Sequence, residues 1–443
     1  MSLQVAIPAY VQVILKVLRR AGYQACPVGG CVRDSLLGKV PHDWDIATSA
    51  LPMETEQTLA GFSCLETGMR HGTITAISDG HPVEITTFRI DGSYSDHRRP
   101  DSVTFTRNLA EDLRRRDFTI NAMAWDNGLV DLFGGRADLE AGIVRCVGDP
   151  AMRFQEDGLR VLRALRFASV LDFTLAPETS LAVHRLRGLL EDIAAERISE
   201  ELKKLLCGPG VGRILRQYAD VLFTILPMLS AQAGCPQHNP YHNCDVWEHT
   251  VRSVEAAPAQ PLLRLILLLH DAGKPACRST GPDGIDHFYR HDRESARLAE
   301  QAAHRLRLSS RETRTVSQAV ARHMLPMPPE RRLLRRRLNQ FGLDFCLLLL
   351  AVQRADTLAQ PPAVHSRLRL LDQSEAILRA LVAEDACFSR AQLAVKGDDL
   401  VKLGLSGPAI GRALDYLLNA VIEEQCPNEK VALLDYWRQH GEK

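Results

Sequence analysis

Two aspartates near the N-terminus have the spacing of a metal-binding pair. Asp43 and Asp45 are separated by one residue within the stretch His42–Thr48, which has the composition of a strand. Side chains two positions apart on a strand point to the same face. Two carboxylates on one face repel each other unless a cation joins them, and Mg²⁺ prefers such oxygen ligands. The pair predicts a magnesium site, and a solvated acidic turn is the simpler alternative.

A glycine-rich turn lies just before this pair. Gly29 and Gly30 follow a short apolar run and open a helical pattern that contains Arg33. Glycines let backbone N–H groups approach a phosphate, and a guanidinium offers a fork of donors to phosphate oxygens. These residues predict a site for nucleotide phosphates, with an ordinary glycine turn as the alternative.

The two features belong to one long compound motif. Residues 29–52 read GGCVRDSLLGKVPHDWDIATSALP, and they resemble the signature of the class II nucleotidyltransferases. This family holds the CCA-adding tRNA nucleotidyltransferases and the bacterial poly(A) polymerases, and it belongs to the DNA polymerase beta-like superfamily. The resemblance implies a nucleotidyltransferase head that binds ATP or CTP, with Mg²⁺ held by Asp43 and Asp45.

A second motif of the same family follows at residues 115–122, which read RRDFTINA. In the family this motif contacts the sugar and the phosphates of the nucleotide. Arg116 is suited to triphosphate oxygens, while Asp117 and Asn121 are suited to ribose hydroxyls or to orienting the arginine. A charged helix start capped by Asp117 is the alternative.

A third motif, EDGLRVLRALRF at residues 156–167, resembles the helix with which the family reads the incoming base. Asp157 and Arg160 are expected three positions apart on a helix, so their side chains would be neighbours. An acceptor beside a donor pairs with cytosine or adenine but opposes the carbonyl that uracil and guanine present there. The pair would serve as a protein template for C and A, with Arg163 in support. Arg163 and Arg166 extend the arginine series and are expected to face phosphates. An exposed ion pair is the alternative.

Two further features of the N-terminal region carry weaker expectations. Glu84 lies on a predicted strand and is a candidate third catalytic carboxylate, or simply a polar strand residue. The segment Asp91–Pro100 reads DGSYSDHRRP and resembles the loop found in members that add A as well as C. A plain surface loop is the alternative.

Histidines and aspartates form an ordered series in the second half of the chain. His270 and Asp271 are adjacent and follow an apolar stretch, a placement that packing alone does not explain because buried polar groups need partners. The order resembles the HD phosphohydrolase superfamily, and the resemblance implies a transition metal such as Ni, Mn, Zn or Fe, which imidazole and carboxylate ligands suit. The full predicted ligand set is His249, His270, Asp271, His291, His323 and Asp356.

Five arginines cluster between residues 331 and 337 on a predicted helix. Helical spacing cannot place all five on one face, so part of the cluster is expected to be solvated. The remainder either contacts an RNA backbone or is solvated as well, and the sequence does not decide between these two interpretations.

The elements that must position these residues change character along the 443-residue chain. Short apolar runs alternate with helical patterns up to about residue 148, and an almost wholly helical pattern follows. The predicted fold class is α+β, with a polymerase-beta-like mixed head. The domains are expected at 1–148 (head), 149–235 (helical neck), 236–365 (HD domain) and 366–443 (helical tail with possible tRNA contact). The predicted strand runs are Gln24–Val28, Trp44–Ala47, Thr73–Ile77, Val83–Phe88 and Ala122–Trp125.

Composition excludes several classes of protein. The chain has 54 basic and 54 acidic residues, so a wholly basic nucleic-acid coat is excluded although local basic grooves remain. No apolar run approaches the roughly 18 residues that a membrane helix needs. Eleven cysteines without a CxxC pair indicate reduced thiols and a cytoplasmic protein.

The sequence therefore predicts an enzyme that adds CMP, CMP and AMP to the 3′ end of tRNA from CTP and ATP with Mg²⁺. An A-adding enzyme or a poly(A) polymerase is the alternative within the family. An HD metal phosphohydrolase whose head only binds nucleotide or RNA is the alternative from another class. The oligomeric state is left open.

Overall fold

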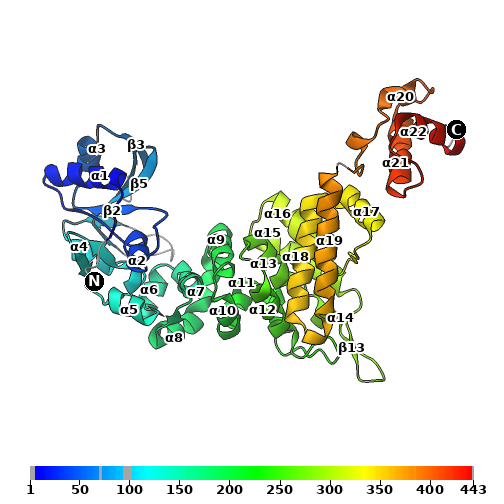
Figure 1. Ribbon diagram of the computed structural model, residues 1–443. Coiled ribbons are helices and arrows are strands. Elements are labelled where there is room, and N and C mark those ends of the chain that lie inside the picture. Colours follow the sequence, from blue (N-terminus) through cyan, green and yellow to red (C-terminus); the bar gives the residue numbers. More distant parts are fainter. Residues whose placement is uncertain (1–4, 69–71, 93–101, 385, 442–443) are drawn as a thin grey trace. The chain divides into compact units, whose positions relative to one another are not determined.

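The computed structural model describes residues 5–68, 72–92, 102–384 and 386–441. The chain divides into two compact units, Met1–Pro227 and Met228–Lys443, which Figure 1 shows in blue to green and in green to red. The mixed α/β start and the helical remainder agree with the predicted fold class. In the described residues, no helix has the length and apolar character needed to span a membrane.

A five-stranded sheet forms the centre of the first unit. Strands β2 and β5 are parallel, and the other neighbouring pairs are antiparallel. The β2–β5 pair therefore brings together residues that are about forty positions apart in the chain. The strand order is β1 (Ala25–Pro27), β2 (Asp45–Thr48), β5 (His81–Thr87), β4 (Thr73–Ser78) and β3 (Ser63–Gly68).

Each of the five predicted strand runs overlaps an observed strand, but β3 was not predicted. Its sequence, SCLETG, has no aromatic residue and only one β-branched residue, Thr67, of the types that mark strands. Two small ribbons complete the strands of the head: β6 (Arg89–Asp91) with β7 (Val103–Phe105), and β8 (Met123–Trp125) with β9 (Leu129–Asp131).

Short helices surround the sheet and carry the predicted motifs. The amphipathic helix α1 buries Val11, Ile14, Leu15 and Leu18. The motif at 115–122 lies between α4 and β8 and includes a 3₁₀ turn at Thr119–Asn121. The helices of this region are α1 (Ala9–Arg20), α2 (Gly30–Leu36), α3 (Pro52–Thr58), α4 (Leu109–Arg114) and α5 (Gly135–Ala141).

The helical remainder of the first unit is built around α7, which buries most of its residues. Asp149 accepts a hydrogen bond from the backbone of Ala151, and Pro150 occupies the first helical position, so α6 begins there. The helices are α6 (Pro150–Glu156), α7 (Leu159–Leu171), α8 (Pro177–Leu186), α9 (Ala195–Leu206), α10 (Val211–Gln217) and α11 (Ala219–Ile225).

The second unit is a helical assembly around the buried helix α13, whose sequence is PLLRLILLL. A second apolar core lies among the helices near the C-terminus. The helices are α12 (Val246–Ala256), α13 (Pro261–Leu269), α14 (Lys274–Cys277), α15 (His291–Arg305), α16 (Ser310–Ala321), α17 (Arg331–Phe341), α18 (Leu343–Ala359), α19 (Ser366–Ala383), α20 (Gly397–Val401), α21 (Pro408–Ile422) and α22 (Lys430–His440).

The almost wholly helical pattern expected after about residue 149 is confirmed, with two short exceptions among the described residues. Strand β11 (Thr174–Leu175) pairs with β10 (Ile143–Val144). The turn residues near 281–284 form a hairpin between β12 (Ser279–Thr280) and β13 (Asp286–His287). Both pairs are two residues long, which is too short to give a period-two pattern in the sequence.

Candidate functional site

Three carboxylates gather where β2 and β5 run side by side. The register of the two parallel strands aligns Asp45 with Glu84. Asp43 precedes β2, because the strand begins at Asp45, so the expectation that both aspartates lie on one strand is wrong. The Asp43 side chain is 84% exposed. The structure nevertheless brings all three predicted carboxylates to one end of the parallel pair.

The electrostatics of Asp45 reflect this crowding. Burial raises the pKa of Asp45 to about 6, with a further contribution from the Glu84 carboxylate and a smaller one from Asp43, while Arg116 acts in the opposite direction. Like charges that crowd in this way are relieved by a cation. A set of carboxylate oxygens is the donor chemistry that Mg²⁺ prefers, so these residues fit a divalent metal.

Gly29 lies against Arg116, and because it has no side chain the guanidinium group can approach its backbone. Its φ is +74°, and a Cβ at this position would lie 2.9 Å from Nη1 of Arg116, so only glycine suits both the conformation and the contact. Arg116 donates to Asp112 at 3.3 Å. Among the described residues, its buried Nε has no hydrogen-bond partner. This open donor, close enough to Asp45 to lower its pKa, fits an anionic ligand.

A hydrogen-bond chain joins the three sequence motifs. Arg33 Nη1 donates to Asn121 Oδ1 at 2.7 Å, and Asn121 Nδ2 donates to Asp117 Oδ1 at 3.2 Å. The other oxygen of Asp117 accepts from Arg163 at 2.6 Å. Burial alone would raise the pKa of Asp117, but the Arg163 guanidinium holds that pKa well below its usual range. Asp117 is thus an ionised residue that orients its neighbours.

Phe167 is a residue to which sequence reasoning assigned no role. The guanidinium groups of Arg33, Arg163 and Arg166 lie 5.2, 5.5 and 3.6 Å from the centroid of its ring. Arg166 Nε also donates to Glu201 at 2.8 Å. Cation–π contacts of this kind hold flat guanidinium groups in place. Phe167 is the last residue of the third motif. An aromatic residue that follows several arginines in the sequence could have indicated this cation–π contact.

The proposed base-reading residues do not have the predicted helical relationship. Asp157 lies in the break between α6 and α7, where its side chain accepts from the backbone of Leu159 at 3.1 Å and from Arg197 at 3.0 Å. Arg160 lies in the first turn of α7 and donates to Glu156 at 2.6 Å. The expectation that both lie on one helix is wrong because α6 ends at Glu156, the backbone of Asp157 is extended, and its side chain bonds to the backbone of Leu159, where α7 begins.

Most of the predicted loop, residues 93–100 of Asp91–Pro100, lies outside the described residues. Asp91 itself ends β6 and forms an ion pair with Arg89 at 3.1 Å. The interpretation of this loop as a feature of members that add A as well as C stays a prediction.

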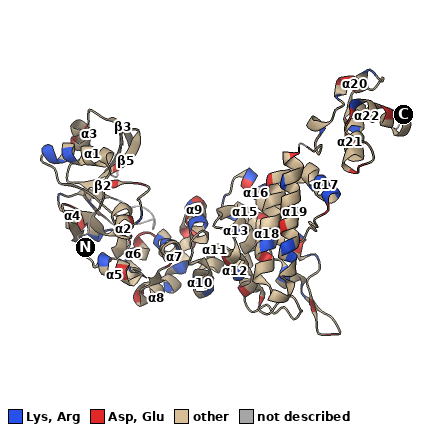
Figure 2. Ribbon diagram, in the orientation of Figure 1, with Lys and Arg blue, Asp and Glu red and all other residues tan. Residues whose placement is uncertain are grey.

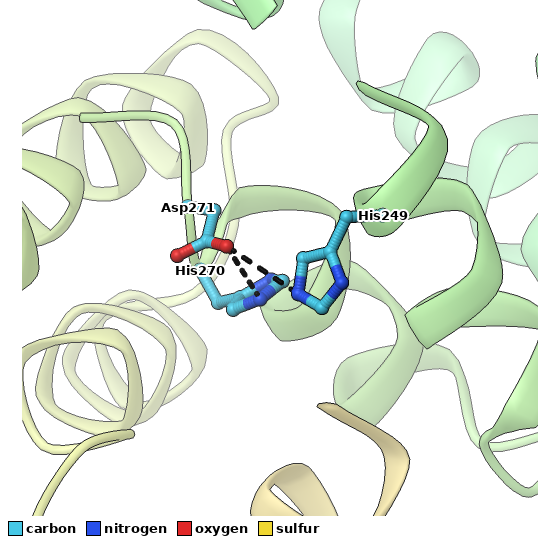
Figure 3. A group of neighbouring side chains, drawn as sticks. All are labelled: His249, His270 and Asp271. Carbon is cyan, nitrogen blue, oxygen red and sulfur yellow. Dashed lines mark ion pairs between the residues drawn. The ribbon is translucent and has the colours of Figure 1, made fainter. Parts of the chain in front are cut away.

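All six predicted HD residues meet in the second unit. The carboxylate of Asp271 is at their centre, as Figure 3 shows for two of the histidines. One oxygen, Oδ2, lies 3.5 Å from His249 Nε2 and 3.2 Å from His270 Nε2. The other, Oδ1, lies 3.4 Å from His291 Nε2 and 3.8 Å from His323 Nε2. Asp356 Oδ1 lies 2.9 Å from His249 Nε2.

The imidazole rings are oriented as metal ligands. The Nδ1 atoms of His270, His291 and His323 lie 2.7, 2.8 and 2.7 Å from backbone carbonyl oxygens. An Nδ1–H that donates to a carbonyl leaves the Nε2 lone pair free to point at the centre. Burial lowers the pKa of His323 to about 4, helped by His270. A neutral ring of this kind is the form that binds a metal.

Lys274 and His242 also border this centre, although the sequence analysis gave them no role. Lys274 Nζ lies 2.6 Å from Asp271 Oδ2 and donates to Gln237 at 2.8 Å. His242 Nε2 lies 3.4 Å from the same ammonium group. Lys274 comes three residues after Asp271 in the sequence, and this spacing could have indicated an ion pair between the two. Both residues line a cavity of about 650 Å³ that also exposes Asp271, His291, His323 and Asp356.

Models of known families match three parts of the chain. Residues 26–145 match the "Poly A polymerase head domain". Residues 172–231 match the "Probable RNA and SrmB- binding site of polymerase A", and residues 294–437 match "tRNA nucleotidyltransferase domain 2 putative". Together with the carboxylates on the parallel strands, these matches define a nucleotidyltransferase with a polymerase-beta-like head.

Curated relatives narrow this class to one family. The chain is 36% identical to a CCA-adding enzyme of Lactiplantibacillus plantarum over 96% of this chain and 94% of that one. It is also 36% identical to the CCA-adding enzyme of Geobacillus stearothermophilus, and the alignment covers 94% of this chain and 93% of that one. A crystal structure of the Bacillus stearothermophilus CCA-adding enzyme in complex with CTP is 31% identical, with a TM-score of 0.73 and 97% of each chain covered. The chain belongs to the CCA-adding enzymes. Membership implies dependence on a divalent metal such as Mg²⁺.

Proposed function

We propose that this chain adds CMP, CMP and AMP in turn to the 3′ end of tRNA, using CTP and ATP and releasing pyrophosphate at each step. The observation that carries the proposal is the parallel pairing of β2 with β5, which aligns Asp45 with Glu84 beside the open donor of Arg116. Its family membership and the matches to RNA-binding and tRNA nucleotidyltransferase domains support the same substrates.

The head residues divide the chemistry between them. Asp43 and Asp45, with Glu84, would hold Mg²⁺, which when bound supplies activation of the attacking hydroxyl and neutralises phosphate charge. Arg116 and the backbone at Gly29 and Gly30 grip the triphosphate. The 3′ hydroxyl of the tRNA attacks the α-phosphate in line, the bond to the bridging oxygen breaks, and pyrophosphate leaves.

The hydrogen-bond chain described above would orient the sugar and the base-reading residues. Asp117 and Asn121 would meet the ribose hydroxyls, and Arg33 and Arg163 are held by them and by Phe167. Asp157 and Arg160 offer an acceptor and a donor at the start of α7, which supports their role as the protein template for C and A. Arg166 assists through its contact with Phe167.

A tRNA that lacks its terminal CCA tests the proposal directly. Incubation of the protein with this tRNA, Mg²⁺ and labelled CTP and ATP is expected to give a product three nucleotides longer, read on a denaturing gel. Addition of one A only to tRNA ending in CC indicates an A-adding enzyme, and a long A ladder indicates a poly(A) polymerase. No incorporation would overturn the proposal in favour of a hydrolase with an RNA-binding head.

Replacement of Asp157 by asparagine is expected to weaken the choice of cytosine over uracil. The amide can turn its NH₂ group toward the uracil carbonyl that the carboxylate repels. The ratio of kcat/KM for CTP to that for UTP should therefore fall by roughly 5- to 150-fold, because a buried polar group left without its partner costs about 1–3 kcal/mol. Steady-state incorporation into tRNA lacking CCA measures the ratio.

The matched control for this variant is Glu178→Gln, a carboxylate on α8 that is 70% exposed. Its ratio should equal that of the wild type. If Asp157→Asn lowers both kcat/KM values equally, the residue supports the fold and does not read the base.

We propose a second function for the second unit, metal-dependent hydrolysis of a phosphate ester. The observation that favours it is the arrangement of five of the six ligand residues in two overlapping groups, His249–His270–Asp271 and Asp271–His291–His323. Nitrogen and carboxylate donors together suit Ni, Mn, Zn or Fe better than Mg. The adjoining cavity would admit the substrate, with Lys274 facing its phosphate.

We also propose that the C-terminal helices contact tRNA and that the protein works in the cytoplasm. A cavity there is lined by Arg412, Tyr416, Trp437 and Arg438, and aromatic and basic side chains together suit RNA. All eleven cysteines are free thiols, which supports a reducing compartment. The domain boundaries near 148, 235 and 365 stay predictions.

A further inference from the structure

The arginine-rich helix α17 carries an unusual density of positive charge. Five of its first seven residues are arginines, and they appear as blue bands on α17 in Figure 2. The sequence left open whether they contact RNA or water. The structure shows a third kind of partner, because most of these guanidinium groups face carboxylates from the chain's own C-terminal region.

The carboxylates come mainly from the end of α21. Glu423 forms ion pairs with two arginines of α17: Arg336, and Arg332 at 3.7 Å. Glu424 lies 3.7 Å from Arg335. A more distant residue, Glu384, pairs with Arg331. Four of the five arginines therefore have a carboxylate partner from elsewhere in the fold.

The C-terminal end of α21 adds a second source of negative charge to the carboxylates of Glu423 and Glu424. Helix α21 ends at Ile422, and Arg335 Nη1 donates to the carbonyl of Val421 at 3.2 Å. The last carbonyls of a helix carry partial negative charge and need donors. Arg335 therefore meets both a carboxylate and a helix C-terminus.

Glu424 occupies a position that normally belongs to glycine. Its φ is +59°, in the left-handed region that side chains with a Cβ adopt reluctantly. A glycine there would end α21 with less strain but would offer no carboxylate to Arg335. Strained residues of this kind concentrate at functional positions.

The ion pairs are accessible enough to be exchanged. The side chains of Arg332 and Arg336 are 60% and 49% exposed. Exposed pairs are weak and are screened by salt. The single carboxylate of Glu423 serves both of these arginines, so it does not use the full donor capacity of the two guanidinium groups. A phosphate offers the same fork-matching oxygens with more negative charge.

We propose that the arginine face of α17 binds the phosphate backbone of RNA, and that Glu423 and Glu424 occupy this face as an internal competitor in the RNA-free protein. The competitor would limit binding to RNAs that can also engage the rest of the enzyme. The inference takes from the proposed function only that tRNA is the RNA partner.

The test compares tRNA affinity in the wild type and in a variant with Glu423→Gln and Glu424→Gln. Fluorescence anisotropy with labelled tRNA lacking CCA is recorded from 50 to 300 mM KCl. The variant is expected to bind about fivefold more tightly at 150 mM KCl, a difference of about 1 kcal/mol. Its plot of log Kd against log salt should be steeper by about 1 to 2, because one to two further phosphates are neutralised.

Two companion variants make the result decisive. Asp415→Asn removes a carboxylate of the same helix that pairs with Arg390 instead of α17, and it should bind as the wild type does. Adding Arg332→Gln and Arg336→Gln to the double glutamine variant should cancel its gain. The proposal would be overturned if the double glutamine variant bound tRNA with an unchanged Kd and salt dependence, or more weakly. The ion pairs between α17 and α21 would then be structural contacts that RNA does not displace. Because affinity is read without catalysis, failure of CCA addition would leave this result interpretable.

Discussion

Replacement of Asp45 by asparagine is expected to reduce nucleotide incorporation by roughly 10³-fold, the scale of losing one preorganised electrostatic group at a reacting phosphate. The amide keeps the shape of the side chain but cannot neutralise a divalent cation. Single-turnover incorporation of labelled CMP into tRNA lacking CCA measures the effect. Asp43→Ala is expected to act in the same direction, and hydrolysis at the HD residues should be unaffected by either change.

The same variant should be more stable than the wild type when metal is absent. The pKa of Asp45 is raised to about 6 by burial and by Glu84, so its charged form costs free energy in the folded state. That cost is absent below the unfolded pKa near 4, grows as the pH rises from about 4 to about 6, and stays constant above the folded pKa. In EDTA at pH 8 the free energy of unfolding should rise by about 2 kcal/mol in Asp45→Asn.

The control for both measurements is Asp79→Asn in the turn between β4 and β5, an equal change in the same sheet. Asn tolerates the left-handed φ of +51° at that position, so activity and stability should stay close to those of the wild type. An Asp45→Asn enzyme that keeps its rate within tenfold would show that this carboxylate does not hold the reacting metal.

Replacement of His270 and Asp271 by alanine is expected to remove bound transition metal and all phosphatase activity while nucleotide incorporation stays within about twofold. Asp271 is shared by both groups of ligands, so no metal retains a complete set. Elemental analysis after loading with Mn²⁺ or Ni²⁺, and release of phosphate from p-nitrophenyl phosphate, measure the two losses.

This double variant also leaves the ammonium group of Lys274 without its carboxylate partner. The Lys274 side chain is 7% exposed and pairs with Asp271. An unpaired buried charge costs about 3–5 kcal/mol, so a second variant, His291→Gln with His323→Gln, removes ligands without stranding a charge. His304→Ala, an exposed histidine on α15, is the matched control. Undiminished metal content, or loss of both activities in a folded variant, would contradict two independent sites.

The first two head motifs could be predicted from the sequence because their residues are close together in the chain. The glycine turn lies between β1 and α2, and the two aspartates lie at the entry to β2. These residues occur within 17 positions, so local backbone preferences largely place them. The third motif shows the limit of such reasoning. An unbroken helix through Asp157 looked equally compatible with the residue types, but the side chain of Asp157 bonds to the backbone of Leu159 and starts a new helix there.

The HD residues were predicted as a set, whereas their geometry was not. The order of histidines and aspartates along the chain indicates a metal centre, but it does not reveal that Asp271 lies between two groups of imidazoles. Lys274 was missed because a lysine is ordinarily expected at the surface. Its burial is acceptable here only because Asp271 and Gln237 neutralise and bind its ammonium group.

The arginines of α17 show the same limit most clearly. Their partners lie 53 to 91 positions further along the chain, and no local pattern predicts an ion pair over such a distance. The sequence alone offered RNA or water as the partner, and the fold supplied carboxylates.

The sequence by itself determined the class of chemistry, the family and the residue types at both candidate centres, because short motifs carry their own backbone and side-chain preferences. Only the tertiary structure decided which of these residues meet. Glu84 joins Asp45 through strand pairing, and Asn121 joins Arg33 across 88 positions. Contacts between distant segments depend on how buried surfaces pack in three dimensions, and one sequence read in order carries no direct record of that packing.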